Sequence, residues 1–253
     1  MLIDTHCHLD AAEFDADRDA VHAAALAGGV ARIVVPAVAV DGFQKAKMVV
    51  ARYPGCVAAY GIHPLYVMQA HESDLAVLRA WLLSEQPLAV GEIGLDGYVT
   101  NVDPLRQEFY FVEQLKLARE FDLPVLLHVR RAVDQILKHL RRIRVRGGIA
   151  HAFNGSRQQA DEFIKLGFAL GFGGAMTFSG STRIRELARQ LPLESIVLET
   201  DAPDIPPAWL NGSRNTPAEL PRIAAVLAEL RELPVAELVQ RTAANARAVL
   251  PGI

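Results

Sequence analysis

Short runs of apolar residues alternate along the chain with longer segments in which apolar residues recur at helical spacing. The short runs consist mainly of Val, Ile, Leu, Ala and Gly, as expected for strands buried on both faces of a parallel sheet. Strands are predicted at residues 1–9, 32–38, 57–63, 88–96, 124–130, 148–153, 168–176 and 195–201. Helices are predicted between them, at residues 17–27, 41–52, 72–84, 103–121, 132–142, 156–166 and 181–190. Two further helices are predicted at residues 216–231 and 235–250.

Strands that alternate with helices in this way predict an α/β protein, and the number of units favours a (β/α)8 TIM barrel. The length of 253 residues is typical of that fold. No low-complexity segment or long linker divides the chain, so residues 1–253 are interpreted as a single domain. An open, doubly wound sheet is the alternative. It would usually carry a glycine-rich turn after the first strand, where this chain instead has His-Cys-His-Leu-Asp.

The first predicted strand contains the pair His6 and His8. Side chains alternate between the two faces of a strand, so both imidazoles project from one face and Cys7 from the other. Two such imidazoles can hold one metal ion, while burying them without partners would be costly. A pair of hydrogen-bonded core histidines is the alternative interpretation of this motif taken by itself.

Residues of types that bind metal ions also lie at the carboxyl ends of several other predicted strands. Their presence decides between the two interpretations. In a barrel the carboxyl ends of the strands meet at one face, so these residues are expected to lie together. They are His63, Glu92, Asp96, His128, His151 and Asp201. The remaining histidines, His22, His71 and His139, fall in predicted helices or loops and are expected to face solvent. The distribution favours a metal site with more than one ion over a set of buried, hydrogen-bonded histidines.

Composition and charge narrow the function classes. A net charge of −3 argues against a surface built as a whole for duplex DNA. The two cysteines, Cys7 and Cys56, suggest neither a disulfide framework nor a thiolate zinc site, and Cys7 is expected to be buried and inert. No apolar stretch has the length of a membrane span, and no segment of signal-peptide type precedes His6. A cytoplasmic monomer without membrane contact is therefore expected.

Seven ordered motifs resemble those of the TatD family of metal-dependent deoxyribonucleases and hydrolases, in its YjjV-like branch. They are IDTHCHLD, GIHP, VGEIGLD, LPVLLHVRRA, HAFNGS, LGFGGAMTF and LETDAPD, followed by Asn215-x-Pro217 and Thr242-x-x-Asn245. The resemblance implies a TIM barrel whose metal site lies at the carboxyl ends of the strands, with two divalent ions. It assigns His6 and His8 to the first ion, Glu92 to both ions, His128 and His151 to the second ion, and Asp201 to the first.

Two divalent ions would contribute about four positive charges. Glu92, Asp201 and a bound hydroxide would neutralise only part of that charge. The remaining positive charge suits a phosphodiester, whose transition state gains negative charge. Asp201 and Glu92 are the expected catalytic residues, because Asp201 would take the proton of a water that bridges the ions. The imidazole-rich set favours zinc, with manganese or magnesium as alternatives. The resemblance implies a deoxyribonuclease, specifically a 3′-to-5′ exonuclease on single-stranded DNA.

Other hydrolytic reactions stay open. The same site would serve another ester, such as an aminoacyl ester on tRNA. Amidohydrolases of this general kind often bridge their metals with a modified lysine, and no lysine ends a strand here. A scaffold that binds metal without catalysis would not need Asp201 together with every ligand.

Residues around the expected centre receive less specific assignments. Asp96 and Glu199 have the strand parity to face inward and to hold the outer ring nitrogens of metal-bound histidines; structural hydrogen bonds are the alternative. His63, Arg130, Phe153 and Asn154 are expected to contact substrate, Arg130 through a phosphate oxygen or else in a pair with Glu199. Tyr66, Tyr98 and Phe153 are candidates for stacking on a base, with simple packing as the alternative.

The glycines of the seventh strand and the one strong basic run complete the motifs. Gly171, Gly173 and Gly174 are expected either to admit an anion or to allow close packing inside the barrel.

The basic run, residues 141–146, connects a helix to the following strand. Such loops lie at the amino-terminal face of a barrel, so this run is predicted to lie opposite the metals and not to bind the substrate.

Overall fold

A computed structural model describes residues 1–253 and contains one parallel sheet in which the strands follow the order β1 to β8. The strands are β1 (Leu2–Asp4), β2 (Val30–Pro36), β3 (Cys56–Tyr60), β4 (Ala89–Asp96), β5 (Val125–Arg130), β6 (Gly148–Ala150), β7 (Phe168–Phe172) and β8 (Ile196–Leu198). The backbone amide of Thr5 donates to the carbonyl of Leu198 at 3.1 Å, which joins the last strand to the first. The predicted (β/α)8 barrel is therefore confirmed.

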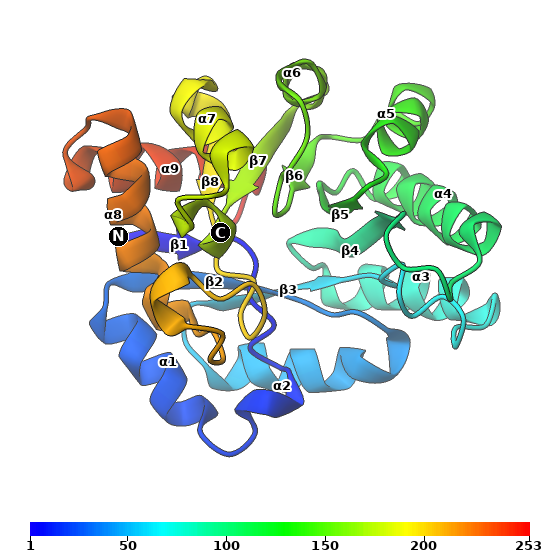
Figure 1. Ribbon diagram of the computed structural model, residues 1–253. Helices are drawn as coiled ribbons and strands as arrows, with labels where there is room; N and C mark the ends of the chain where they lie inside the picture. Colours follow the sequence, from blue (N-terminus) through cyan, green and yellow to red (C-terminus); the bar gives the residue numbers. More distant parts are fainter.

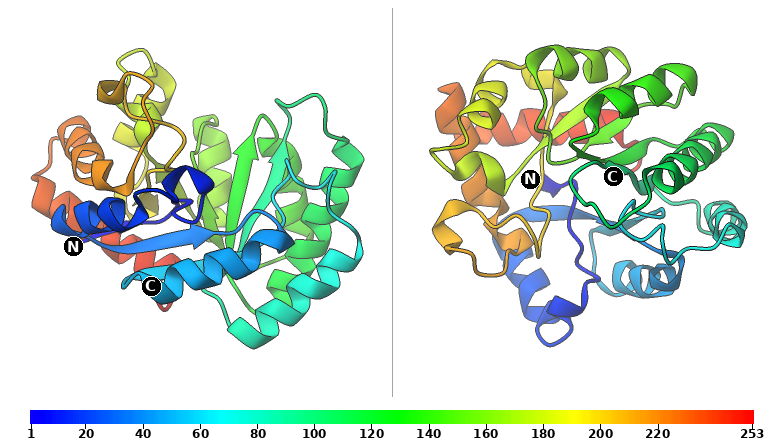
Figure 2. Two further views of the ribbon diagram at one scale, coloured as in Figure 1. Left: turned by 90° about the horizontal axis from the view of Figure 1, so that it is seen from below. Right: turned by 45° about the vertical axis from the view of Figure 1, so that its right-hand side comes forward.

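The helices lie around the outside of the strands (Figures 1 and 2). One helix follows each of the first seven strands, and two follow β8. They are α1 (Arg18–Ala27), α2 (Phe43–Arg52), α3 (Ser73–Glu85), α4 (Pro104–Glu120), α5 (Val133–Arg142), α6 (Arg157–Lys165), α7 (Thr182–Gln190), α8 (Leu220–Arg231) and α9 (Val235–Val249). None of them combines the length and the apolar character needed to cross a membrane.

The interior of the barrel is filled by a layer to which every strand contributes one buried apolar side chain. These side chains pack with Ala243, Ala246 and Leu250, which belong to α9 and to the residue that follows it. Helix α9 thus closes the amino-terminal end of the barrel. The layer consists of Ile3, Val34, Ala59, Ala89, Leu126, Ile149, Ala169 and Val197. Because the side chains of this layer are apolar, polar groups that point inward gather beyond it, at the carboxyl ends of the strands.

Most strands end earlier than the apolar pattern predicts. Strand β1 covers Leu2–Asp4 instead of residues 1–9, and β8 covers Ile196–Leu198 instead of residues 195–201. Beyond the ladders the chain still lies against its neighbours: the amide of Cys7 donates to the Val34 carbonyl at 3.0 Å, and that of His8 to the Ala202 carbonyl at 2.8 Å. These extensions form the mouth of the barrel. The expected ligands therefore lie on segments that leave the sheet but are held by its edges.

Two of the three histidines expected to face solvent are buried, which corrects that prediction. The His22 ring on α1 lies with Nε2 3.1 Å from the Pro54 carbonyl oxygen. The His139 ring on α5 lies with Nε2 2.7 Å from a carboxylate oxygen of Glu108 on α4. Both rings fill contacts between neighbouring elements, which helix periodicity alone does not reveal. His71 is exposed, as predicted.

The basic run begins in the last turn of α5 and continues toward β6, at the end of the barrel that α9 closes. Arg141 pairs with Glu162 on α6 at 2.8 Å, and Arg146 lies 3.4 Å from Asp122. Arg142 and Arg144 are exposed. The predicted position, at the face opposite the carboxyl ends of the strands, agrees with the structure.

Both thiols are buried, and we expect them to be unreactive in the folded protein. Burial raises the pKa of the Cys56 thiol to about 12 and moves the pKa of Cys7 well above its ordinary value. Since the thiolate is the reactive form, almost none is present at pH 8. Titration with a thiol reagent at that pH should detect no rapid reaction in native protein and two thiols after unfolding. Rapid modification of either thiol without loss of structure would contradict this burial.

Candidate metal centre

Imidazoles and carboxylates from six different strands converge at the mouth of the barrel. Their positions follow from the apolar layer below them: His128 lies two residues beyond Leu126, and His151 two residues beyond Ile149. In β4 the pairing with β5 shifts between Val90 and Ile93, so Glu92 points inward although it lies three residues beyond Ala89. The converging residues are His6, His8, His63, Glu92, His128, His151 and Asp201.

Glu92 lies at the centre of this group, and its two oxygens face different histidines. Oε2 lies 3.1 Å from His6 Nε2 and 3.5 Å from His8 Nε2. Oε1 lies 2.9 Å from His128 Nδ1 and 3.8 Å from His151 Nε2. The side chain is 2 % exposed. This arrangement fits a carboxylate that connects two groups of ligands, one from β1 and one from β5 and β6.

Asp201 faces the β1 side of the group. Its Oδ1 lies 3.6 Å from His6 Nε2, 3.7 Å from His8 Nε2 and 3.8 Å from His151 Nε2. The backbone of Asp201 has φ 58°, in the left-handed region that few residues other than glycine adopt. Its amide donates to the His6 carbonyl at 2.8 Å. The loop that carries the carboxylate is thus fixed directly to the segment that carries the first histidine pair.

Two buried polar side chains hold this loop through hydrogen bonds to its backbone and to Thr200. The Asp4 carboxylate accepts the amide of Thr200 at 2.9 Å and its hydroxyl at 2.6 Å. The Asn215 side-chain amide donates to the carbonyls of Thr200 and Asp204 at 2.8 Å and 2.9 Å. Burial raises the pKa of Asp4 to about 8. Sequence reasoning missed both contacts; the motif Asn215-x-Pro217 was the one signal, and it carried no role by itself.

Contacts of the outer ring nitrogens show which nitrogen is free to bind an ion in His8, His128 and His151. His8 Nδ1 lies 3.2 Å from the Pro36 carbonyl oxygen, and a carbonyl can only accept a hydrogen bond. His151 Nδ1 lies 3.1 Å from Glu199 Oε1, and His128 Nε2 lies 2.9 Å from Asp96 Oδ2. When these outer nitrogens carry the protons, the inner nitrogens present lone pairs toward Glu92 and Asp201. Lone pairs that face carboxylates repel unless cations lie between them, so the donor set fits divalent metal ions.

The close approach of imidazoles and carboxylates also shifts the pKa values of these residues. Burial alone would raise the pKa of Glu92, but the surrounding imidazoles outweigh it and hold that pKa well below its ordinary value. Burial opposes the charged form of His151, yet Asp201 and Glu199 raise the pKa of His151 to about 10. The Glu92 carboxylate thus stays charged and requires positive charge beside it. Divalent ions would supply it and displace protons from the rings.

His63 lies beside these ligands but directs a protonated ring nitrogen toward them. Its Nδ1 accepts the amide of Leu65 at 3.1 Å, so the proton of the neutral ring is on Nε2. Nε2 lies 3.0 Å from His128 Nδ1 and 3.4 Å from Glu92 Oε1. Burial lowers the pKa of His63, which keeps the ring neutral. His63 therefore presents a hydrogen-bond donor to the mouth, which suits contact with a substrate oxygen.

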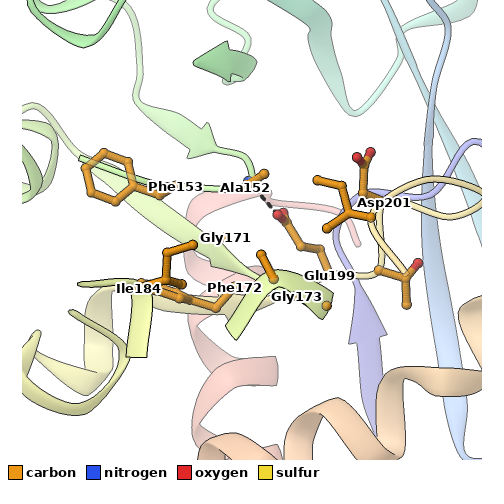
Figure 3. Close-up of a pocket in the computed structure, with 12 residues that line it drawn as sticks. Ala152, Phe153, Gly171, Phe172, Gly173, Ile184, Glu199 and Asp201 are labelled. Atoms are coloured by element: carbon orange, nitrogen blue, oxygen red, sulfur yellow. Dashed lines mark hydrogen bonds between the residues drawn. The ribbon is translucent and has the colours of Figure 1, made fainter. Parts of the chain in front are cut away.

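Asp96 and Glu199 occupy the positions that strand parity predicts for them. Asp96 Oδ2 contacts His128, while Oδ1 accepts the amides of Tyr98 and Val99 at 2.8 Å and 3.1 Å. Burial alone would raise the pKa of Asp96, but these hydrogen bonds lower it to about 2. Glu199 reaches from the end of β8 to His151 and also accepts the amide of Ala152 at 2.6 Å (Figure 3). Each carboxylate thus fixes the orientation of one histidine.

Glu199 can reach His151 only because β7 has a glycine at position 171. A Cβ atom at Gly171 would lie 2.1 Å from Glu199 Oε2. We expect Gly171→Ala to displace this carboxylate, and removing such a hydrogen bond to a metal-bound histidine typically costs about ten- to a hundredfold in metal affinity. Gly42→Ala is the matched control, because no atom lies within 4 Å of a Cβ built there. Metal titration of both variants measures the effect, and equal affinities would show that Glu199 does not orient His151.

The residues expected to contact substrate are placed differently from one another. Phe153 is 1 % exposed, packs against Phe163 and points away from Asp201 (Figure 3). That placement corrects its assignment, since a buried ring cannot stack on a base. Asn154 is exposed at the mouth, where its Oδ1 accepts the Arg183 guanidinium at 2.7 Å. Arg130 lies at the rim beside Asp96, with its Nη1 3.9 Å from Oδ2, and not beside Glu199.

The glycine-rich end of β7 lines a narrow pocket next to Glu199 (Figure 3). Cβ atoms at Gly173 and Gly174 would lie 2.7 Å from the Glu199 carbonyl oxygen and 2.1 Å from the Ile205 carbonyl oxygen. Close packing therefore accounts for these two glycines.

Comparison with known proteins agrees with this architecture. The family model described as "TatD related DNase" matches residues 3–251. The metal-dependent hydrolase YjjV of Escherichia coli, whose name describes it as uncharacterised, is 40% identical over 94% of this chain and 93% of its own length. Its crystal structure superposes with a TM-score of 0.95 and covers 98% of this chain and 97% of that chain. The "3'-5' ssDNA/RNA exonuclease TatD" of Cronobacter sakazakii is 34% identical over 97% of this chain and 96% of its own length. The chain belongs to the TatD family of metal-dependent hydrolases.

Proposed function

We propose that this protein hydrolyses phosphodiester bonds of single-stranded nucleic acid, DNA in particular, and that it does so as a 3′-to-5′ exonuclease with two divalent ions. One observation carries the proposal: Glu92 directs one oxygen toward the β1 histidines and the other toward His128. A carboxylate placed in this way fits two ions, and two ions side by side suit displacement at phosphorus. The name of the Cronobacter sakazakii relative supports nucleic acid as the substrate class.

The ligands divide into two sets around Glu92. His6, His8 and Asp201 would hold the first ion, and His128 and His151 the second. The imidazole-rich set favours zinc, with manganese or magnesium as alternatives. When bound, the ions supply positive charge for the phosphate oxygens and lower the pKa of water at the site.

The protein side chains have distinct tasks in this reaction. Asp201 accepts the proton of the attacking water, because its carboxylate is 13 % exposed and can pass that proton to solvent, whereas Glu92 is 2 % exposed. His63 donates from Nε2 to a phosphate oxygen. Asp96 and Glu199 hold His128 and His151 in the orientation that the ions require.

A steady-state comparison on four substrates tests this function. The metal-reconstituted protein is assayed on single-stranded DNA, single-stranded RNA, bis(p-nitrophenyl) phosphate and an aminoacyl ester, with end-labelled DNA to give the direction of degradation. We expect kcat/KM on DNA to exceed that on the aminoacyl ester by about a hundredfold or more, the scale of a substrate-specific contribution. Preference for the aminoacyl ester, or release of nucleotides from the 5′ end, would overturn the respective part of the proposal.

A further inference from the structure

A cluster of one tyrosine and two arginines lies on the rim of the mouth, at the ends of β4 and β5. The Arg130 guanidinium carbon lies 4.1 Å from the centroid of the Tyr98 ring, and that of Arg131 lies 4.6 Å from it. Tyr98 is 50 % exposed and the Arg130 side chain 51 %. Both guanidinium groups are thus held against an aromatic ring while their surroundings remain open to solvent.

This rim cluster of Tyr98, Arg130 and Arg131 is connected to the metal centre through Asp96. One oxygen of Asp96 contacts His128, and the other accepts the amide of Tyr98 at 2.8 Å. Arg130 lies on the same strand as His128, two residues farther along. The Gly97 amide donates to the Arg130 carbonyl at 2.7 Å. The cluster is therefore held at the ends of the two strands by hydrogen bonds to Asp96 and Arg130.

The charge of the rim cluster is largely uncompensated. Arg130 has one acidic neighbour, Asp96 at 3.9 Å, and that carboxylate is already engaged with His128. Arg131 is exposed and forms no ion pair. Arg214 differs in this respect, since its guanidinium group pairs with Asp17 at 2.6 Å. Two free guanidinium groups beside the centre favour an anionic ligand.

We propose that Tyr98, Arg130 and Arg131 form a second phosphate subsite, which binds the phosphodiester adjoining the one that is cleaved. The inference rests on the proposed function. Guanidinium groups stacked on a ring keep their N–H edges free, and those edges match the oxygens of a phosphate. Grooves that bind single strands combine such cations with aromatic side chains. The subsite would make the protein prefer chains with at least two phosphodiesters over esters that have one.

The test compares substrates that differ in the number of phosphates. The double variant Arg130→Gln/Arg131→Gln is assayed on a thymidine tetranucleotide and on bis(p-nitrophenyl) phosphate. We expect KM for the tetranucleotide to rise about tenfold or more, the scale of one charge-assisted hydrogen bond. The loss on the small diester should stay within about threefold, since that substrate has no second phosphate to occupy the subsite. The dependence of kcat/KM on salt should flatten by roughly 0.7 for each arginine–phosphate pair that the substitutions remove.

The control removes the same charge elsewhere. Arg142→Gln/Arg144→Gln lies at the opposite end of the barrel and should leave KM and the salt dependence within about twofold of wild type. Tyr98→Leu keeps both charges and tests the ring by itself; it should raise KM for the tetranucleotide by about threefold. If the double variant does not fold, the single variant Arg131→Gln replaces it, because the Arg131 side chain contacts neither an acidic residue nor a metal ligand.

Four results would overturn the subsite. The first is an equal loss on both substrates together with loss of metal, which would show that Arg130 acts through Asp96. The others are an unchanged KM for the tetranucleotide, an equal loss in the control variant, and an unchanged salt dependence of kcat/KM. Binding of a fluorescent tetranucleotide, followed by anisotropy, separates the subsite from the proposed function. If wild type binds it without cleaving it and the double variant binds it about tenfold more weakly, the subsite stands and the nuclease function fails. If wild type does not bind it, the subsite is wrong.

Discussion

Replacing Glu92 by glutamine is expected to reduce bound metal below one equivalent per chain and turnover by at least about a thousandfold. The substitution keeps the shape of the side chain but removes the charge to which both sets of histidines are directed. Oε2 faces the β1 pair and Oε1 faces His128, so no other carboxylate can replace it. Elemental analysis after metal loading and desalting, together with kcat on single-stranded DNA, measures both effects.

Glu120→Gln is the matched control for this variant. Glu120 is a surface carboxylate paired with Arg79, and its removal should change neither metal content nor turnover by more than about twofold. Thermal unfolding of both variants shows whether the fold is kept. If Glu92→Gln retained two ions and near-normal turnover, the assignment of Glu92 as the shared ligand would be wrong.

The second large effect is expected for Asp201→Asn, which should lower turnover by at least about a hundredfold. Asparagine tolerates the left-handed backbone at this position, where φ is 58°, so the loop should keep its conformation. Metal content should fall less than in Glu92→Gln, because Asp201 directs one oxygen toward the histidines whereas Glu92 directs both of its oxygens. A large loss of rate with most of the metal retained is the pattern that identifies a proton acceptor.

Asp204→Asn provides the comparison, since Asp204 lies in the same loop but is exposed. Its amide donates to the Asp201 carbonyl at 2.8 Å, a hydrogen bond that the substitution leaves in place. We expect a change of less than about threefold. Near-normal turnover of Asp201→Asn with both ions bound would exclude Asp201 as the proton acceptor and direct attention to Glu199 or a histidine.

The barrel and the convergence of the ligands could be predicted from the sequence because both follow from local periodicity. Alternation along a strand places His128 above Leu126 and Glu199 above Val197, on the inward face. Alternation from Glu92 places Asp96 on the side of His128, where the structure has it, although the inward position of Glu92 itself depends on the register shift in β4. The order of strands and helices then brings the strand ends to one face, so residues far apart in the chain meet.

Other features depend on contacts that no local pattern contains. His22 and His139 are buried because Pro54 and Glu108 happen to face them from other elements. Alternation would place Phe153 on the inward face with His151, but Ala152, whose φ is 44°, turns the chain between them. Asn215 acts on the Asp201 loop through backbone carbonyls, and the sequence shows that it is present but not where its amide points.

The ion content of the wild-type protein tests the central claim most directly. After loading with zinc or manganese and removal of free metal, elemental analysis should give two ions per chain, because the two oxygens of Glu92 face different histidines. His6→Ala should lose most of the first ion and keep part of the second, because His128 contacts Glu92 without the help of His6. A value below one equivalent in wild type and in His6→Ala alike would contradict the proposed centre.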